Sequence, residues 1–149
     1  MGSEIPFPFK IQPSKTIINE MPAEVTASMA LLEDWKIASR LTSLKNYAGC
    51  FNGYVTELAD IWLEKLDSDQ RKEVEIFSCG PTSMLKAVSK LAKKYNLSCQ
   101  VSLEEYMACA VGGCAGCTVL IETKNGNEMK RVCVDGPVFE AKNVVQFQN

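Results

Sequence analysis

The sequence predicts an α/β protein in which a parallel sheet with helices is followed by a small domain containing a β-hairpin. Two observations carry this prediction. Amphipathic helices alternate with short strands between residues 55 and 103, and small residues and cysteines replace that alternation from Glu104 to Cys117. We place the domain boundary at this change, so residues 1–101 form the first domain and residues 102–149 the second.

The elements before Gly53 are weakly defined. Prolines interrupt the first 22 residues and break any regular period, which is typical of a linker or an incomplete element. Residues 29–35 suit a short helix, and residues 36–41 suit a strand.

The helices and strands after Gly53 are clearer. Apolar residues recur at steps of three and four from Val55 to Leu66, which predicts a helix that ends at residues 67–69. A strand over residues 74–77, a sharp turn and a helix with an apolar stripe from Met84 to Tyr95 follow. Thr82 or Ser83 suits its N-cap. With a strand at 99–103, this order predicts βαβ units and a parallel sheet.

The C-terminal part carries a hairpin pattern. Residues 118–123 and 128–133 are strand-like, and the Asn125-Gly126 pair between them favours a tight turn.

Composition excludes several classes of function. The chain has 149 residues and a net charge of −2, so there is no bulk electrostatic case for nucleic acid or an anionic membrane. It has no run of about 18 apolar residues and no signal-peptide pattern at its start, which favours a cytoplasmic location. It has no histidine, which excludes Rieske centres, histidine-bearing zinc sites and histidine-based acid–base catalysis.

The seven cysteines are an odd count, which argues against a closed disulfide framework and for metal or redox chemistry. Cys109, Cys114 and Cys117 form a C-x4-C-x2-C motif, and Cys133 follows after 15 further residues. This is the spacing of plant-type [2Fe–2S] ferredoxins. Glycines in the loop permit positive φ angles and allow N–H groups to reach the cluster sulfurs. The motif predicts four cluster ligands and single-electron transfer.

Other interpretations of the cysteines are weaker. Zinc on four cysteines usually pairs two C-x2-C knuckles, and only Cys114 and Cys117 form one here. A zinc-stabilised interaction module is nevertheless the alternative from another functional class. A thioredoxin-like pair should open a helix, whereas Cys117 leads into a strand-like run. Cys50 and Cys99 are expected to be small buried residues.

Cys79 leaves two interpretations open. It stands at the end of a strand and before a helix, where α/β sheets place ligands and where helix N–H groups favour a phosphate. Simple turn chemistry explains it equally well.

Several stretches resemble known families. Cys79-Gly80-Pro81 with the following residues 84–88 resembles the nicotinamide-side motif of the ferredoxin-reductase superfamily. Residues 102–117 and 131–139 resemble the dihydroorotate dehydrogenase electron transfer subunit, and residues 53–58 resemble that family's helix start after its nucleotide-binding loop.

The resemblance implies a partial ferredoxin-reductase-type NAD-binding domain followed by a [2Fe–2S] domain. It implies transfer of electrons from NADH through FAD and the cluster to the FMN of a catalytic dihydroorotate dehydrogenase subunit, in pyrimidine biosynthesis. That subunit would be the partner in a hetero-oligomer, with no nucleic acid or membrane. Related subunits of a hydrogenase, sulfide dehydrogenase or transhydrogenase are the alternative. The cofactor-binding residues carried over are Cys79, Gly80, Pro81, Gly53 and Thr56.

The sequence departs from the family pattern in one large respect. It has no Arg-x-Tyr-Ser/Thr flavin motif and no glycine-rich loop that would open the nucleotide domain. We therefore expect a C-terminal fragment with no catalytic residue, inactive with NADH by itself, whose FAD and NAD sites are complete only in the full-length subunit.

Overall fold

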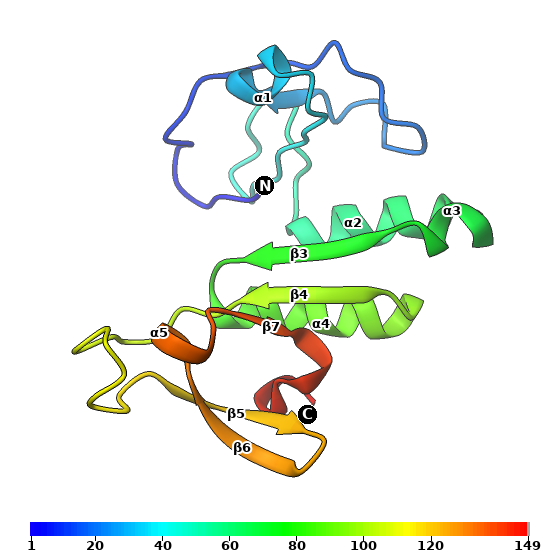
Figure 1. The fold of residues 1–149 in the computed structure, drawn as a ribbon. Coiled ribbons are helices and arrows are strands. Elements are labelled where there is room, and N and C mark those ends of the chain that lie inside the picture. Colours follow the sequence, from blue (N-terminus) through cyan, green and yellow to red (C-terminus); the bar gives the residue numbers. More distant parts are fainter. Residues whose placement is uncertain (149) are drawn as a thin grey trace. The chain divides into compact units, whose positions relative to one another are not determined.

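The computed structural model describes residues 1–148 (Figure 1). The chain divides into two compact units, Met1–Asp67 and the part from Ser68 onward. The domain boundary predicted near residue 102 falls inside the second unit, because strands on both sides of it share one sheet. The division at that point into a nucleotide-binding domain and a cluster-binding domain, which the family resemblance implies, stays a prediction.

The first unit contains a small two-stranded sheet and two helices. Strand β1 (Ile11–Pro13) pairs antiparallel with β2 (Ala27–Met29), and α1 (Ala30–Asp34) follows β2 directly. The short helix predicted at residues 29–35 is therefore confirmed.

The strand predicted at residues 36–41 is wrong. Polar side chains in this segment hydrogen-bond to other parts of the unit in place of a strand ladder. The Ser39 hydroxyl accepts the Met29 N–H at 3.2 Å, and the Arg40 guanidinium donates to the Thr16 carbonyl at 2.8 Å. Side chains of this kind compete with regular backbone pairing.

Helix α2 (Val55–Lys65) confirms the first amphipathic helix. The Glu57 carboxylate accepts the Tyr54 N–H at 2.7 Å, which satisfies one of the donors left free where the helix begins. Leu58 and Leu63 are its buried residues. A further short helix, α3 (Ser68–Lys72), occupies residues that the sequence analysis treated only as the end of α2.

The second unit begins with α3 and continues with the predicted βαβ unit. Strand β3 (Glu75–Cys79), helix α4 (Thr82–Tyr95) and strand β4 (Ser98–Ser102) follow in order, and the two strands pair in parallel. Strand β7 (Val138–Glu140) pairs antiparallel with the other edge of β4, which gives the order β3-β4-β7.

The predicted N-cap of α4 is wrong by one residue. Thr82 is already the first helical residue, and Pro81 is the N-cap, with its carbonyl accepting the Leu85 N–H at 3.0 Å. The helix ends at Asn96, which has a left-handed φ of 54°. Asparagine tolerates this conformation better than most residues, so it suits the end of a helix.

The hairpin consists of β5 (Thr118–Thr123) and β6 (Gly126–Arg131), joined by Lys124 and Asn125, so the turn lies one residue before the predicted Asn125-Gly126 pair. The second strand ends two residues earlier than predicted, because the short helix α5 (Val132–Asp135) begins there. The Asp135 carboxylate accepts the Arg131 N–H at 2.7 Å and stabilises this change of direction. Two 3₁₀ turns, Ala141–Asn143 and Val145–Phe147, complete the described chain.

One hydrophobic core holds the second unit together. It joins α4, β4, the hairpin and the 3₁₀ turns through buried side chains that include Leu85, Val101, Ile121, Val132, Val144 and Phe147. Leu103 and Cys117 belong to this core as well. The loop between β4 and β5 is therefore fixed to the core at both of its ends. None of the helices described in residues 1–148 is long and apolar enough to cross a membrane.

Candidate metal centre

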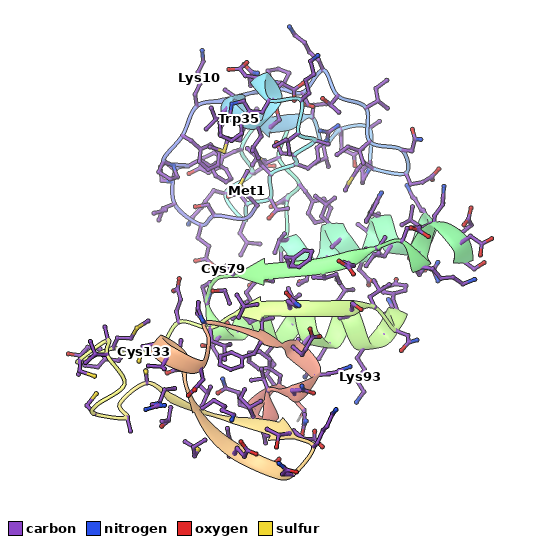
Figure 2. All side chains as sticks on the ribbon, viewed as in Figure 1. Met1, Lys10, Trp35, Cys79, Lys93 and Cys133 are labelled. Carbon is purple, nitrogen blue, oxygen red and sulfur yellow. The ribbon has the colours of Figure 1, made fainter. Side chains whose placement is uncertain are left out.

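The four predicted cluster ligands lie on the loop between β4 and β5 and on α5. Cys109 is half-buried and Cys114 is exposed, whereas Cys117, immediately before β5, is only 3% exposed. Cys133 is half-buried in α5, where Figure 2 labels it. The sequence analysis had placed Cys133 at the end of a strand. It lies instead in the turn that follows β6.

The base of the hairpin brings Cys117 and Cys133 together. Thr118 and Arg131 form the last pair of the β5–β6 ladder, and the Val132 N–H donates to the Cys117 carbonyl at 3.0 Å. Hydrogen bonds from the Cys133 amide and thiol lower the pKa of Cys117. In return, the Cys117 thiol and then burial raise the pKa of Cys133.

Cys109 and Cys114 form a second pair. The backbone amides of Val111 and Cys114, followed by the Cys114 thiol, lower the pKa of Cys109 to about 6. The Gly116 N–H lies 3.4 Å from the Cys114 sulfur. Amide donors aimed at sulfur favour the thiolate, which is the form that binds metal.

Gly112 lies between Cys133 and Arg131. Its N–H is close to the sulfur of Cys133, and its carbonyl accepts Nη1 of Arg131 at 3.0 Å. The charge of Cys109 also acts on Cys133, contributing to the rise in the pKa of that thiol after the Cys117 thiol and burial. Cys109 of one pair therefore acts on Cys133 of the other.

The donor set consists of four cysteine thiols in two neighbouring pairs. A structural zinc ion needs all four thiolates around one atom, whereas [2Fe–2S] clusters spread four thiolates over two irons. Two neighbouring pairs of thiols, each with amide donors, match the second requirement.

The remaining cysteines differ in their surroundings. Cys99 is buried in the core of the second unit, where burial raises the pKa of its thiol to about 11. Cys50 in the first unit is half-buried, and burial raises the pKa of its thiol as well.

Cys79 is exposed at the carboxyl end of β3, where Figure 2 labels it. Its sulfur lies 3.8 Å from Oε1 of Glu104. Gly80 has a φ of 151°, and Pro81 is the N-cap of α4, so the predicted turn between strand and helix is confirmed.

Gly53 and Thr56 lie in the first unit. Gly53 is buried, and a Cβ atom there would lie 2.6 Å from Oε2 of Glu57 and 2.6 Å from Cε1 of Phe51. Thr56 is in the first turn of α2. A nucleotide role for these residues and for Cys79, Gly80 and Pro81 stays a prediction.

The sequence analysis gave Arg131 no role, yet its side chain contacts the cysteine loop. The only indication in the sequence is that Arg131 stands four residues before Asp135, a spacing that allows an ion pair on a helix or turn. Nothing in that spacing indicates a contact with Gly112, 19 residues earlier in the chain.

Comparison with known proteins identifies this loop. Residues 104–145, which include all four cysteines, match the family described as the iron-sulfur cluster binding domain of dihydroorotate dehydrogenase B. The predicted resemblance is confirmed.

Curated relatives agree with this match. The chain is 41% identical over 93 residues to the dihydroorotate dehydrogenase B (NAD(+)) electron transfer subunit of Caldanaerobacter subterraneus, over 62% of this chain and 35% of the relative. It is 37% identical over 89 residues to the probable counterpart in Methanocaldococcus jannaschii, over 60% of this chain and 30% of that protein. The chain thus spans about a third of the length of these relatives.

A solved structure shares the fold. It is described as an NADH-dependent reduced ferredoxin-NADP oxidoreductase and matches with a TM-score of 0.60 at 24% identity, over 78% of this chain and 38% of that chain. The predicted mixed α/β class is confirmed by this neighbour and by the sheets themselves.

Proposed function

We propose that Cys109, Cys114, Cys117 and Cys133 bind a [2Fe–2S] cluster in an electron transfer subunit of dihydroorotate dehydrogenase. The observation that carries the proposal is the family match over residues 104–145, which spans the complete C-x4-C-x2-C…C motif. The pairing of the four thiols supports the same ligand set.

A cluster of this kind, when bound, accepts and donates one electron at a time. The protein supplies the ligands and their surroundings. Amides of Val111, Gly112 and Cys114 point at ligand sulfurs, and donors of this kind tune a cluster's reduction potential. Cys117 is held in the buried base of the hairpin, while Cys114 lies on the exposed side of the loop. That exposed side is where a redox partner can approach.

The wider function rests on the relatives. We propose that in the full-length subunit NADH reduces FAD, and that electrons pass through the ligands described here to the FMN of a catalytic subunit that oxidises dihydroorotate. A flavin is needed between hydride and cluster because hydride carries two electrons. In the second unit we propose Cys79, Gly80 and Pro81 as nucleotide contacts, since they lie at the carboxyl end of a parallel strand. In the first unit we propose Gly53 and Thr56.

Metal and sulfide analysis of the purified chain tests the ligand assignment. We expect about two iron and two sulfide ions per chain and broad absorption between about 400 and 550 nm that dithionite bleaches, as is typical of thiolate-bound [2Fe–2S] clusters. One zinc ion with no iron or sulfide would instead support the zinc-stabilised interaction module.

A second experiment tests the partner. The chain, loaded with its cluster, is mixed anaerobically with an FMN-containing catalytic subunit and dihydroorotate. We expect dihydroorotate to bleach the cluster only when the catalytic subunit is present. The same subunit without dihydroorotate is the control. Failure with this partner, together with reduction by a hydrogenase or sulfide dehydrogenase, would assign the chain to a related complex.

A further inference from the structure

Arg131 joins the cysteine loop to the turn that carries Cys133. Its Nη1 donates to the Gly112 carbonyl at 3.0 Å, and its Nε lies 3.4 Å from Oδ2 of Asp135. The same carboxylate oxygen accepts the Arg131 backbone N–H at 2.7 Å. Asp135 therefore fixes the guanidinium from one side while the guanidinium holds the loop on the other.

The Gly112 residue is held at three points. Its carbonyl accepts Nη1 of Arg131 at 3.0 Å, and its N–H is close to the sulfur of Cys133. Its α-carbon lies against α5 so closely that a Cβ atom would come within 2.7 Å of Cγ2 of Val134. The two peptide groups of one glycine thus connect a charged side chain with a proposed cluster ligand.

We infer that Arg131 is a positioning residue that holds Gly112 against α5, keeps the Gly112 N–H close to the Cys133 sulfur and thereby raises the reduction potential of the cluster. The inference rests on the proposed function. Reduction adds a negative charge to the cluster. An N–H donor on a ligand sulfur and a nearby guanidinium both stabilise that charge.

The hairpin offers a matched control for charge. Lys130 precedes Arg131 on β6 and pairs with Glu128 at 2.7 Å. Lys130→Gln and Arg131→Gln remove the same charge at adjacent positions, but only Arg131→Gln removes the donor to the Gly112 carbonyl. Arg131→Lys keeps the charge and loses the planar fork that reaches two acceptors.

Two measurements on the 149-residue chain test the inference. The midpoint potential of the loaded chain is obtained from a redox titration followed by electron paramagnetic resonance. We expect a clearly lower potential in Arg131→Gln, a smaller decrease in Arg131→Lys and little change in Lys130→Gln. In the metal-free chain, amide hydrogen exchange over residues 110–114 should accelerate several-fold in Arg131→Gln and stay unchanged in Lys130→Gln.

The outcomes separate the inference from the proposed function. Equal potentials in Arg131→Gln and Lys130→Gln would show that Arg131 acts only through its charge, which would overturn the inference. Unchanged exchange in metal-free Arg131→Gln would also overturn it, since the loop would then be held without the guanidinium. A wild-type chain that binds zinc but no iron or sulfide would overturn the proposed function and the effect on potential, while the exchange measurement still decides whether Arg131 holds the loop.

Discussion

Gly112 is the residue on which the geometry of the cysteine loop depends most. Its φ of 78° lies in the left-handed region, and its α-carbon faces Val134 and Arg131 without room for a side chain. We predict that Gly112→Ala destabilises the loop by about 1–2 kcal/mol from backbone strain alone. The overlap with Cγ2 of Val134 adds to this cost. Denaturant unfolding and the rate of cluster loss in air measure the effect.

Gly113 provides the control for this prediction. It is the next residue, its φ is not positive, and no atom lies within 4 Å of the position its Cβ would take. Gly113→Ala should retain near wild-type stability and cluster lifetime. If both alanine variants behave alike, the conformation at residue 112 does not decide how the loop folds.

Cys133 should be essential for the cluster, although it lies in a helix turn and not in the loop. Cys133→Ser replaces a thiolate by a much poorer iron ligand, so we predict loss or marked weakening of the cluster. Cys50→Ser and Cys99→Ser should keep it, because neither residue contributes to the two thiol pairs. The ratio of absorbance near about 420 nm to protein concentration reports occupancy of thiolate-bound iron. Equal loss in all three variants would contradict the ligand assignment.

At the scale of elements, the sequence predicted the regular parts well and the transitions poorly. The β5 bounds agree at both ends, because a β-branched run there is followed by a tight turn at Lys124 and Asn125. The end of β6 was misplaced because a side-chain contact, from the Asp135 carboxylate to the Arg131 N–H, decides it. The first residue of α4 was misplaced because the N-cap is Pro81, which makes no side-chain cap hydrogen bond. The strand at 36–41 failed because its polar side chains bond to residues far away in the sequence, which local patterns do not reveal.

Hydrogen bonds from residues 14–16 to Glu33 in α1 make the stability of the first unit depend on pH. The Ser14 hydroxyl donates to the Glu33 carboxylate at 2.8 Å, and the backbone N–H groups of Lys15 and Thr16 donate at 2.6 and 3.1 Å. The Ser14 hydrogen bond, with the two amides, lowers the pKa of Glu33 below its ordinary value of 4.5. Stabilisation from a lowered carboxyl pKa is present above that value and is lost as the pH falls through the lower, folded-state pKa.

We therefore predict that Glu33→Gln lowers the midpoint of thermal unfolding at neutral pH and flattens its decline below pH 4.5. The pH profile of the full chain, followed by circular dichroism, measures both effects. Asp34→Asn is the control, because it removes the exposed neighbouring carboxylate. A wild-type profile that is already flat below this pH would show that the Glu33 contacts contribute nothing to stability.

At the scale of the whole molecule, spacing alone predicted which four cysteines form the candidate site. It did not predict how they are arranged. The pairing of Cys117 with Cys133 follows from the hairpin register, and the link from Gly112 to α5 depends on a side chain outside the motif. Ligand identity can be recognised from spacing because iron requires thiolates at fixed separations, whereas the groups that orient those ligands come from wherever the fold brings them.

The 149-residue chain is expected to be inactive with NADH. Hydride transfer delivers two electrons and a [2Fe–2S] cluster accepts one, so a flavin must stand between them. These residues contain no Arg-x-Tyr-Ser/Thr flavin motif, and they span about a third of the electron transfer subunits that they match. We expect NADH to leave the cluster oxidised in this chain, while dithionite reduces it. Stopped-flow absorbance after mixing with NADH, with and without FAD, measures the rate.

A full-length electron transfer subunit provides the positive control, because its flavin should allow NADH to bleach the cluster within the same experiment. Adding the flavin-containing portion as a separate chain should restore part of that rate if the two portions associate. Rapid bleaching by NADH in the untreated 149-residue chain would instead reveal a flavin site among these residues. The first place to seek it would then be the carboxyl end of β3, where parallel strands commonly bind nucleotides and where Cys79, Gly80 and Pro81 lie.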